Sequence, residues 1–119
     1  MAQETILLVE DEPAVRQLFA TALTRAGYQV FEARNGEEAV KLFDQHASAI
    51  DLLLTDMRMP YMGGAELAKE LRGRKQSLKL ICISGYPGTA GNEVTQDFLA
   101  KPFSRDEMLR KIRDVLDRP

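Results

Sequence analysis

In the stretch LLTDMRMP, residues 53–60, a nearly unbroken apolar run ends at an aspartate, and a Met-Pro pair that indicates a turn follows. The run begins at Ile50 and continues through residues 52–54, which are all leucine. A charged carboxylate is costly to bury and is rarely left without partners in a folded protein. Asp56 is therefore either a strand-end cap that the backbone satisfies or a group held for chemistry.

Apolar runs of this kind alternate with amphipathic stretches along the whole chain. Strands are predicted over 5–10, 28–33, 51–56, 78–84 and 97–101, and helices over 13–27, 35–46, 63–74 and 104–117. The glycine-rich segment 85–96 leaves room for only a short or irregular fourth helix. Apolar strands that alternate with helices indicate a parallel sheet covered on both faces, with right-handed crossovers. The pattern predicts an α/β fold, a three-layer, doubly wound, five-stranded parallel sheet of the flavodoxin-like type, in a single domain over residues 1–119.

Composition narrows the partners that this chain can have. The net charge is −2, from 16 basic and 18 acidic residues, which gives no electrostatic reason to expect direct contact with nucleic acid or an anionic membrane. Cys82 is the only cysteine, so an internal disulfide is excluded, and a reducing cytoplasmic location fits. No secretory signal pattern and no apolar run of membrane-spanning length is present.

Polar residues stand at the ends of four of the predicted strands, at the edge where open parallel sheets bind their ligands. In chain order they are Glu10, Asp11 and Glu12, then Asp56, then Ser84, then Lys101 followed by Pro102. Carboxylates brought together repel one another unless a cation intervenes, and oxygen donors without His or Cys suit Mg²⁺. A lysine and a metal ion around one carboxylate can hold the equatorial oxygens of a phosphoryl group. Asp56 is therefore interpreted as a nucleophile that forms an acyl phosphate.

Four motifs, VEDE, LLTDMRMP, ISGY and FLAKPF, occur in this order and cover the ends of the predicted strands. With them the whole chain resembles a response-regulator receiver domain of two-component signalling. The resemblance implies a phosphorelay in which a histidine on a sensor kinase or phosphotransfer domain donates a phosphoryl group, and the domain then changes conformation. As an isolated domain it would catalyse only its own phosphorylation and dephosphorylation. The SGYP motif and the short segment after it further resemble receivers of hybrid sensor histidine kinases.

The resemblance assigns the metal and phosphoryl sites residue by residue. Glu10 and Asp11 match the acidic pair that holds Mg²⁺, with Asp11 as the direct ligand. Asp56 matches the phosphoacceptor, which also contacts the metal ion, and the backbone carbonyl of Met57 matches a third protein ligand.

Five further residues receive roles around the phosphoryl group. Lys101 matches the lysine that pairs with it, Ser84 the switch hydroxyl that moves to bond it, and Phe98 the switch aromatic. Arg58 and Tyr86 lie two residues beyond Asp56 and Ser84, where they are candidates for slowing the attack of water on the phosphorylated state.

Two other functions are weighed against this one. A flavodoxin-like module for a small anionic ligand would place a Gly- or hydroxyl-rich loop after the first strand, where this chain has EDEP. A stand-alone aspartate-based phosphohydrolase would need a second aspartate at position 58, which is arginine. We also expect no output domain in this chain, and a monomer or a weak dimer, because the shortened segment 85–96 leaves little apolar surface for a partner.

Overall fold

The computed structural model describes residues 4–57, 62–84, 97–100 and 102–118. Five parallel strands form one sheet with the order β2-β1-β3-β4-β5. The strands are β1 (Thr5–Val9), β2 (Gln29–Ala33), β3 (Ile50–Asp56), β4 (Lys79–Ser84) and β5 (Phe98–Ala100). This confirms the predicted parallel sheet, and the order places the ends of β1 and β3 side by side.

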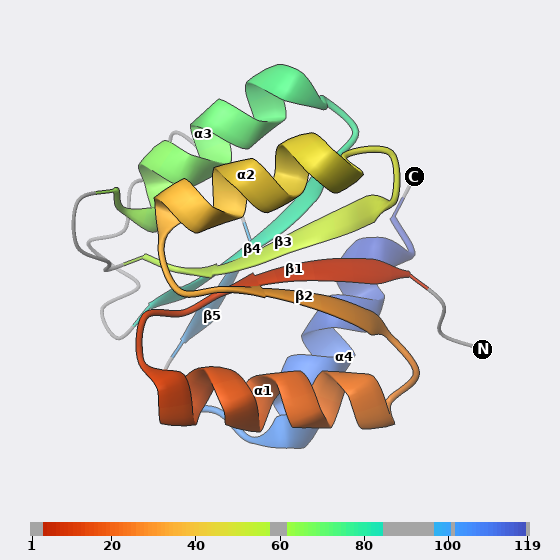
Figure 1. Ribbon diagram of the computed structural model, residues 1–119. Helices are drawn as coiled ribbons and strands as arrows, with labels where there is room; N and C mark the ends of the chain where they lie inside the picture. The colour runs from red at the N-terminus through yellow and green to blue at the C-terminus, as the bar shows by residue number, and fades with distance from the viewer. Residues whose placement is uncertain (1–3, 58–61, 85–96, 101, 119) are drawn as a thin grey trace.

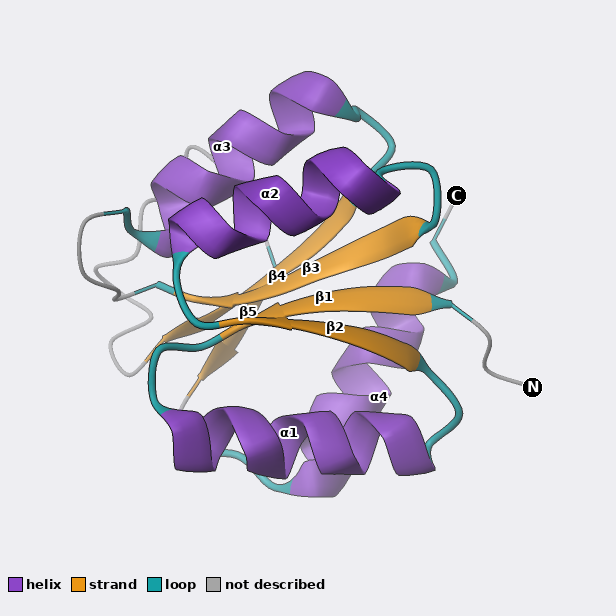
Figure 2. Ribbon diagram, viewed as in Figure 1, coloured by secondary structure: helices purple, strands orange, loops and turns teal. Residues whose placement is uncertain are grey.

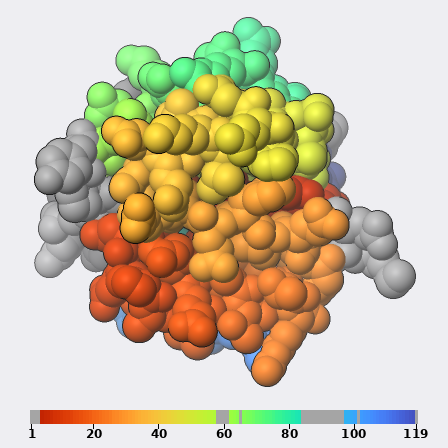
Figure 3. Space-filling view, in the orientation of Figure 1, coloured from red at the N-terminus to blue at the C-terminus, as the bar shows by residue number. Residues whose placement is uncertain are grey.

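Helices cover both faces of the sheet, which makes three layers (Figures 1 and 2). The helices α2 (Gly36–His46) and α3 (Gly64–Arg74) lie on one face, and α1 (Pro13–Arg25) and α4 (Arg105–Leu116) lie on the other. The carboxyl ends of the strands gather on the side where α1, α2 and α3 begin (Figure 1). In the space-filling view, α1 lies below the β2 edge of the sheet and α2 lies above it, and the surface between them is unbroken (Figure 3).

Two apolar clusters, one on each face of the sheet, form the core. Alternate residues of β1 divide between them: Ile6 and Leu8 pack toward α1 and α4, whereas Leu7 and Val9 pack toward α2 and α3. All four are fully buried. The apolar runs in β1 and β3 are continuous because helices cover both faces of the sheet. A sheet with one face exposed to solvent would show alternating apolar and polar residues instead.

Local signals in the sequence set the ends of the helices. Pro13 is the first residue of α1, and Gly27, which follows its end, has a φ of 102°, a conformation that favours glycine. The side chain of Asn35 accepts a hydrogen bond from the Glu38 N–H and caps α2. Ser104 caps α4. The short helix expected within residues 85–96 lies outside the described residues.

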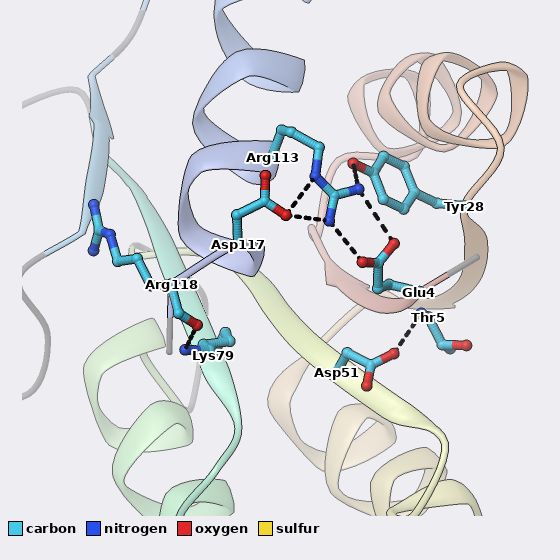
Figure 4. A network of polar contacts seen from close by, with 8 residues as sticks. All are labelled: Glu4, Thr5, Tyr28, Asp51, Lys79, Arg113, Asp117 and Arg118. Atoms are coloured by element: carbon cyan, nitrogen blue, oxygen red, sulfur yellow. Dashed lines mark hydrogen bonds and ion pairs between the residues drawn. The ribbon is translucent and has the colours of Figure 1, made fainter. Parts of the chain in front are cut away.

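A polar network joins the start of the sheet to the last helix, at the end of the molecule opposite the carboxyl ends of the strands (Figure 4). The Arg113 guanidinium donates to Glu4 Oε2 at 2.6 Å, to Asp117 Oδ1 at 2.9 Å and to the Tyr28 hydroxyl at 3.4 Å. The hydrogen bonds to the two carboxylates, Glu4 first, raise the pKa of Arg113. These contacts fasten residues 4 and 113 together, near the two ends of the described chain.

Candidate acidic site at the carboxyl edge of the sheet

The turn after β1 carries the first two acidic residues of the site. The Glu10 N–H donates to the Ala33 carbonyl at 3.0 Å, which continues the pairing of β1 with β2. The side chain of Glu10 is buried, and its Oε2 accepts from the Glu12 N–H at 3.1 Å, where α1 is about to begin. Asp11 is exposed. The turn therefore holds one carboxylate inside the protein and presents the next to solvent.

The end of β3 supplies the third carboxylate. Asp56 is buried, with 7% of its surface exposed, and it lies opposite Ile83 of β4. The Met57 N–H donates to the Ile83 carbonyl at 2.9 Å, so the ladder between β3 and β4 continues one residue past Asp56. Pairing with β1 up to Thr55 and with β4 through Asp56 therefore fixes the backbone that carries this carboxylate.

These three carboxylates meet at one point. Glu10, Asp11 and Asp56 each offer an oxygen atom, and the three oxygens lie within 4.8 Å of one another. Like charges this close destabilise the ionised forms unless a cation offsets them. The donor set is all oxygen, one part of it open to solvent, which fits a Mg²⁺ ion that keeps several of its waters. Sequence-based reasoning predicted this cluster, and the structure brings its three members together.

The Met57 carbonyl has a second use in the structure. Its oxygen accepts a hydrogen bond of 3.1 Å from the N–H of Gly64, the first residue of α3. A carbonyl oxygen has two lone pairs, so this bond occupies one and leaves one for another partner. The bond to Gly64 therefore leaves the carbonyl able to bind a metal ion, and its assignment as a metal ligand stays a prediction.

The remaining predicted residues divide by what the structure describes. Ser84 is the last residue of β4, at the same edge as Asp56, but its side chain lies outside the described part. Phe98 opens β5, pairs with Cys82 and is half-buried against the cluster under α2 and α3. Lys101, Arg58 and Tyr86 lie outside the described residues. Their roles stay predictions.

Comparison with known proteins decides the family. A family model described as the response regulator receiver domain matches residues 6–113. The chain belongs to this family. This confirms the resemblance that the four motifs carry. A receiver domain thus describes the chain better than the alternative, a flavodoxin-like module for a small anionic ligand.

Curated relatives include both kinases and transcriptional regulators. Sensor kinase CckA of Brucella abortus is 37% identical over 119 residues, which cover 96% of this chain and 13% of that protein. The phosphate regulon transcriptional regulatory protein PhoB of Pseudomonas aeruginosa is 33% identical over 129 residues, which cover 99% of this chain and 54% of that protein. The receiver domain thus spans only part of the length of these relatives.

Solved structures agree with the sequence relatives. The receiver domain of the hybrid histidine kinase CckA has a TM-score of 0.84 and 38% identity, over 95% of this chain and 99% of that one. The response regulator TrrA of Thermotoga maritima, solved in complex with Mg²⁺ and beryllofluoride, has a TM-score of 0.83 and 33% identity, over 94% of this chain and 98% of that one.

The family carries general properties with it. Receiver domains bind Mg²⁺ at an acidic site, and they interact with histidine kinases or phosphotransfer partners in two-component systems. Of the helices that the structure describes, none is both long enough and apolar enough to cross a lipid bilayer.

Proposed function

We propose that this receiver domain accepts a phosphoryl group on Asp56 from a histidine of a sensor kinase or a phosphotransfer domain. The observation that carries the proposal is the convergence of Glu10, Asp11 and Asp56, whose oxygens lie within 4.8 Å of one another at the carboxyl edge of the sheet. Of the three, only Asp56 lies within a strand, the central β3, which pairs with β1 up to Thr55 and with β4 through Asp56. A rigid mount of this kind favours a reacting group over a merely solvated one.

Asp11 and Asp56 would hold Mg²⁺ directly, with Glu10 buried behind them. The ion would supply positive charge beside the oxygens of the phosphoryl group, where negative charge concentrates during transfer. The protein's own part is positioning. Bonds from the Glu12 N–H to Glu10 and from the Arg16 guanidinium to the Glu10 carbonyl, at 3.1 and 2.9 Å, hold the turn after β1 in place before any ligand arrives.

In the proposed transfer an Asp56 carboxylate oxygen forms a bond to phosphorus while the bond from phosphorus to the donor imidazole nitrogen breaks. The product is an acyl phosphate, and its later hydrolysis returns the carboxylate and inorganic phosphate. Lys101 would pair with the phosphoryl oxygens, and Ser84 with Phe98 would report the modification to the rest of the domain. Arg58 and Tyr86 would set the lifetime of the phosphorylated state.

Several properties of the whole protein follow as proposals of the same kind. The receiver domain acts on its own phosphorylation state rather than on a separate substrate, and it works as a monomer or weak dimer in the cytoplasm. The 37% sequence identity with sensor kinase CckA supports a partner of the histidine kinase class. A hybrid kinase is one protein in which this receiver would work.

Replacement of the phosphoacceptor tests the proposal directly. We expect Asp56→Asn to abolish labelling by acetyl phosphate in the presence of Mg²⁺, because the neutral amide keeps the shape of the side chain but lacks the negatively charged oxygen that attacks phosphorus. Phosphate-affinity gels and intact-protein mass would measure the labelled fraction. The matched control is Asp44→Asn, on the exposed face of α2, where the carboxylate pairs with Arg74 at 2.6 Å.

The control variant should label at the rate of the unmodified protein. Equal labelling of Asp56→Asn and the unmodified protein would contradict the proposal. Peptide mapping of the phosphorylated protein would then locate the residue that accepts the group.

A further inference from the structure

Gly64, the first residue of α3, lies directly against the end of β3. Its N–H donates to the Met57 carbonyl at 3.1 Å. A Cβ atom at position 64 would clash with the carbonyl oxygen of Asp56 and would lie 2.9 Å from the Cα of Met57 and 3.1 Å from the carbonyl carbon of Asp56. All three are backbone atoms, so no rotation of a flexible side chain can relieve the contact.

The reason for glycine at this position is space rather than backbone conformation. Among the described glycines the structure gives a positive φ only to Gly27, so the backbone at Gly64 is one that alanine adopts freely. Alanine would also favour a helix more than glycine does. Glycine at position 64 is less favourable for the helix than alanine, and the backbone conformation does not require it. The close approach of the two backbones is therefore the reason for glycine here.

Neither the end of β3 nor the first turn of α3 can move away from this contact without disturbing the packing or pairing that holds it. On the strand side, Thr55 pairs with Val9 of β1, and Asp56 pairs with Ile83 of β4. On the helix side, Leu67 and Ala68 are fully buried in the cluster beneath α2 and α3. A methyl group at position 64 would therefore push the Asp56–Met57 backbone and the first turn of α3 apart against two packed structures.

We propose that Gly64 is a positioning residue for the phosphoacceptor: its missing side chain lets α3 seat against β3 and fixes where the Asp56 carboxylate stands relative to Glu10 and Asp11. This inference rests on the proposed function of Asp56. The same peptide is held from further sides, because Thr55 Oγ1 donates to the Asp56 carbonyl at 3.1 Å and the Met57 N–H donates to β4. Gly64 completes this support on the side of α3.

The size of the expected effect follows from the tolerance of reacting groups to displacement. Functional constellations hold their groups within about 0.5 Å of the productive position. A misplacement of about 1 Å can slow a reaction roughly a hundredfold. The clash at position 64 requires a shift of several tenths of an ångström, so Gly64→Ala should slow phosphorylation by about tenfold to a hundredfold.

The chain offers a matched control in the same helix. Gly73 is exposed, and a Cβ atom there would meet nothing within 4 Å. Gly64→Ala and Gly73→Ala make the same chemical change in α3, one against Asp56 and one facing open space. We would measure the initial rate of labelling by acetyl phosphate and the Mg²⁺ concentration for half-maximal rate, well below the unfolding midpoint of each variant.

The expected result is a Gly73→Ala rate equal to that of the unmodified protein, with a slow Gly64→Ala variant that needs more Mg²⁺. A purely structural role for Gly64 would lower the unfolding midpoint and leave both quantities unchanged below it, which would overturn the inference. If the unmodified protein takes no label, the proposed function fails first, so the two failures are distinguishable.

A second variant covers the case in which Gly64→Ala does not fold. At Gly63, which precedes α3, a Cβ atom would lie 3.3 Å from the Met57 carbonyl oxygen, a milder crowding of the same peptide. Gly63→Ala should slow labelling by about threefold relative to Gly73→Ala, in keeping with a smaller displacement. Equal rates in these two variants would then overturn the inference.

Discussion

Cys82 lies in the middle of β4 with no exposed surface. Burial, with a smaller contribution from the charge of Asp97, raises the pKa of this thiol to about 12. The thiolate is the reactive form of cysteine, and here both its formation and its access are suppressed. Cys82 is therefore a small, buried and unreactive side chain of the core.

Native Cys82 should resist thiol reagents at pH 8. Because labelling requires the sheet to open, we expect the reaction with an aromatic disulfide reagent to be at least about a thousandfold slower than in concentrated urea. The absorbance of the released thiolate measures both rates, and a short peptide with one cysteine serves as control. Comparable rates in the folded and unfolded protein would show that β4 is accessible.

At the scale of single residues, the carboxylates were predictable and Gly64 was not. Glu10, Asp11 and Asp56 stand out in the sequence because acidic residues that end apolar runs need partners. Gly64 follows a turn in a glycine pair, which reads as an ordinary helix start. Its closeness to Asp56 depends on how α3 packs on β3, and such packing is not visible in local sequence. A glycine where a helix would favour alanine was the only available signal.

Among the elements, α4 shows most clearly how local sequence defines a helix end. The Ser104 hydroxyl accepts from the Glu107 N–H at 3.0 Å, and the Glu107 carboxylate accepts from the Ser104 N–H at 2.9 Å. Ser104 and Glu107 stand three residues apart at the start of the helix, which is the sequence spacing of a capping box, and the structure shows both of its hydrogen bonds. Its hydrogen bonds, that of the Ser104 backbone first, lower the pKa of Glu107.

Ser104→Ala should therefore destabilise the domain by about 1 kcal/mol at neutral pH, the usual effect of losing an N-terminal cap. Since the folded state lowers the pKa of Glu107, its contribution is present above the ordinary value of 4.5 and is lost as the pH falls through the lowered value. Alanine keeps the Ser104 backbone N–H that binds the Glu107 carboxylate, so only the part of the loss that comes from the hydroxyl bond to this carboxylate should fade toward acid. Urea unfolding of both proteins from pH 7 to pH 3 measures the difference in stability. Ser48→Ala, in the exposed turn after α2, is the control, and an equal loss in both variants would contradict this explanation.

Other elements were predictable to different degrees for physical reasons. β1 and β3 were recognised because their apolar runs are buried on both faces, whereas the described β5 has only three residues and depends on its neighbour β4. The ends of α1 follow from Pro13 and Gly27, whose backbone preferences are local. Elements defined by their own residues can be read from sequence, and elements defined by contacts are read less well.

Across the whole molecule, the order of the strands decides whether the acidic residues meet. Alternating strands and helices predict a parallel sheet but do not by themselves fix the order β2-β1-β3-β4-β5. That order makes β1 and β3 neighbours, with Val9 opposite Thr55, so that Glu10, Asp11 and Asp56 leave the sheet at adjacent points. The acidic site is thus a consequence of topology, and its ligand should stabilise the entire fold.

Beryllofluoride with Mg²⁺ imitates the phosphoryl group and tests this coupling. A ligand that binds only the folded state adds about 2.7 kcal/mol of stability when its free concentration is about a hundred times its dissociation constant. For a domain of this size the unfolding midpoint should then rise by roughly 10 °C. Thermal unfolding followed by circular dichroism, with and without the adduct, measures the shift. Asp56→Asn should lose the shift, Asp11→Asn should need more Mg²⁺ to reach it, and Asp44→Asn should keep it. A similar rise in Asp56→Asn would mean that the adduct binds elsewhere, and the convergence of carboxylates between β1 and β3 would then have no role in binding it.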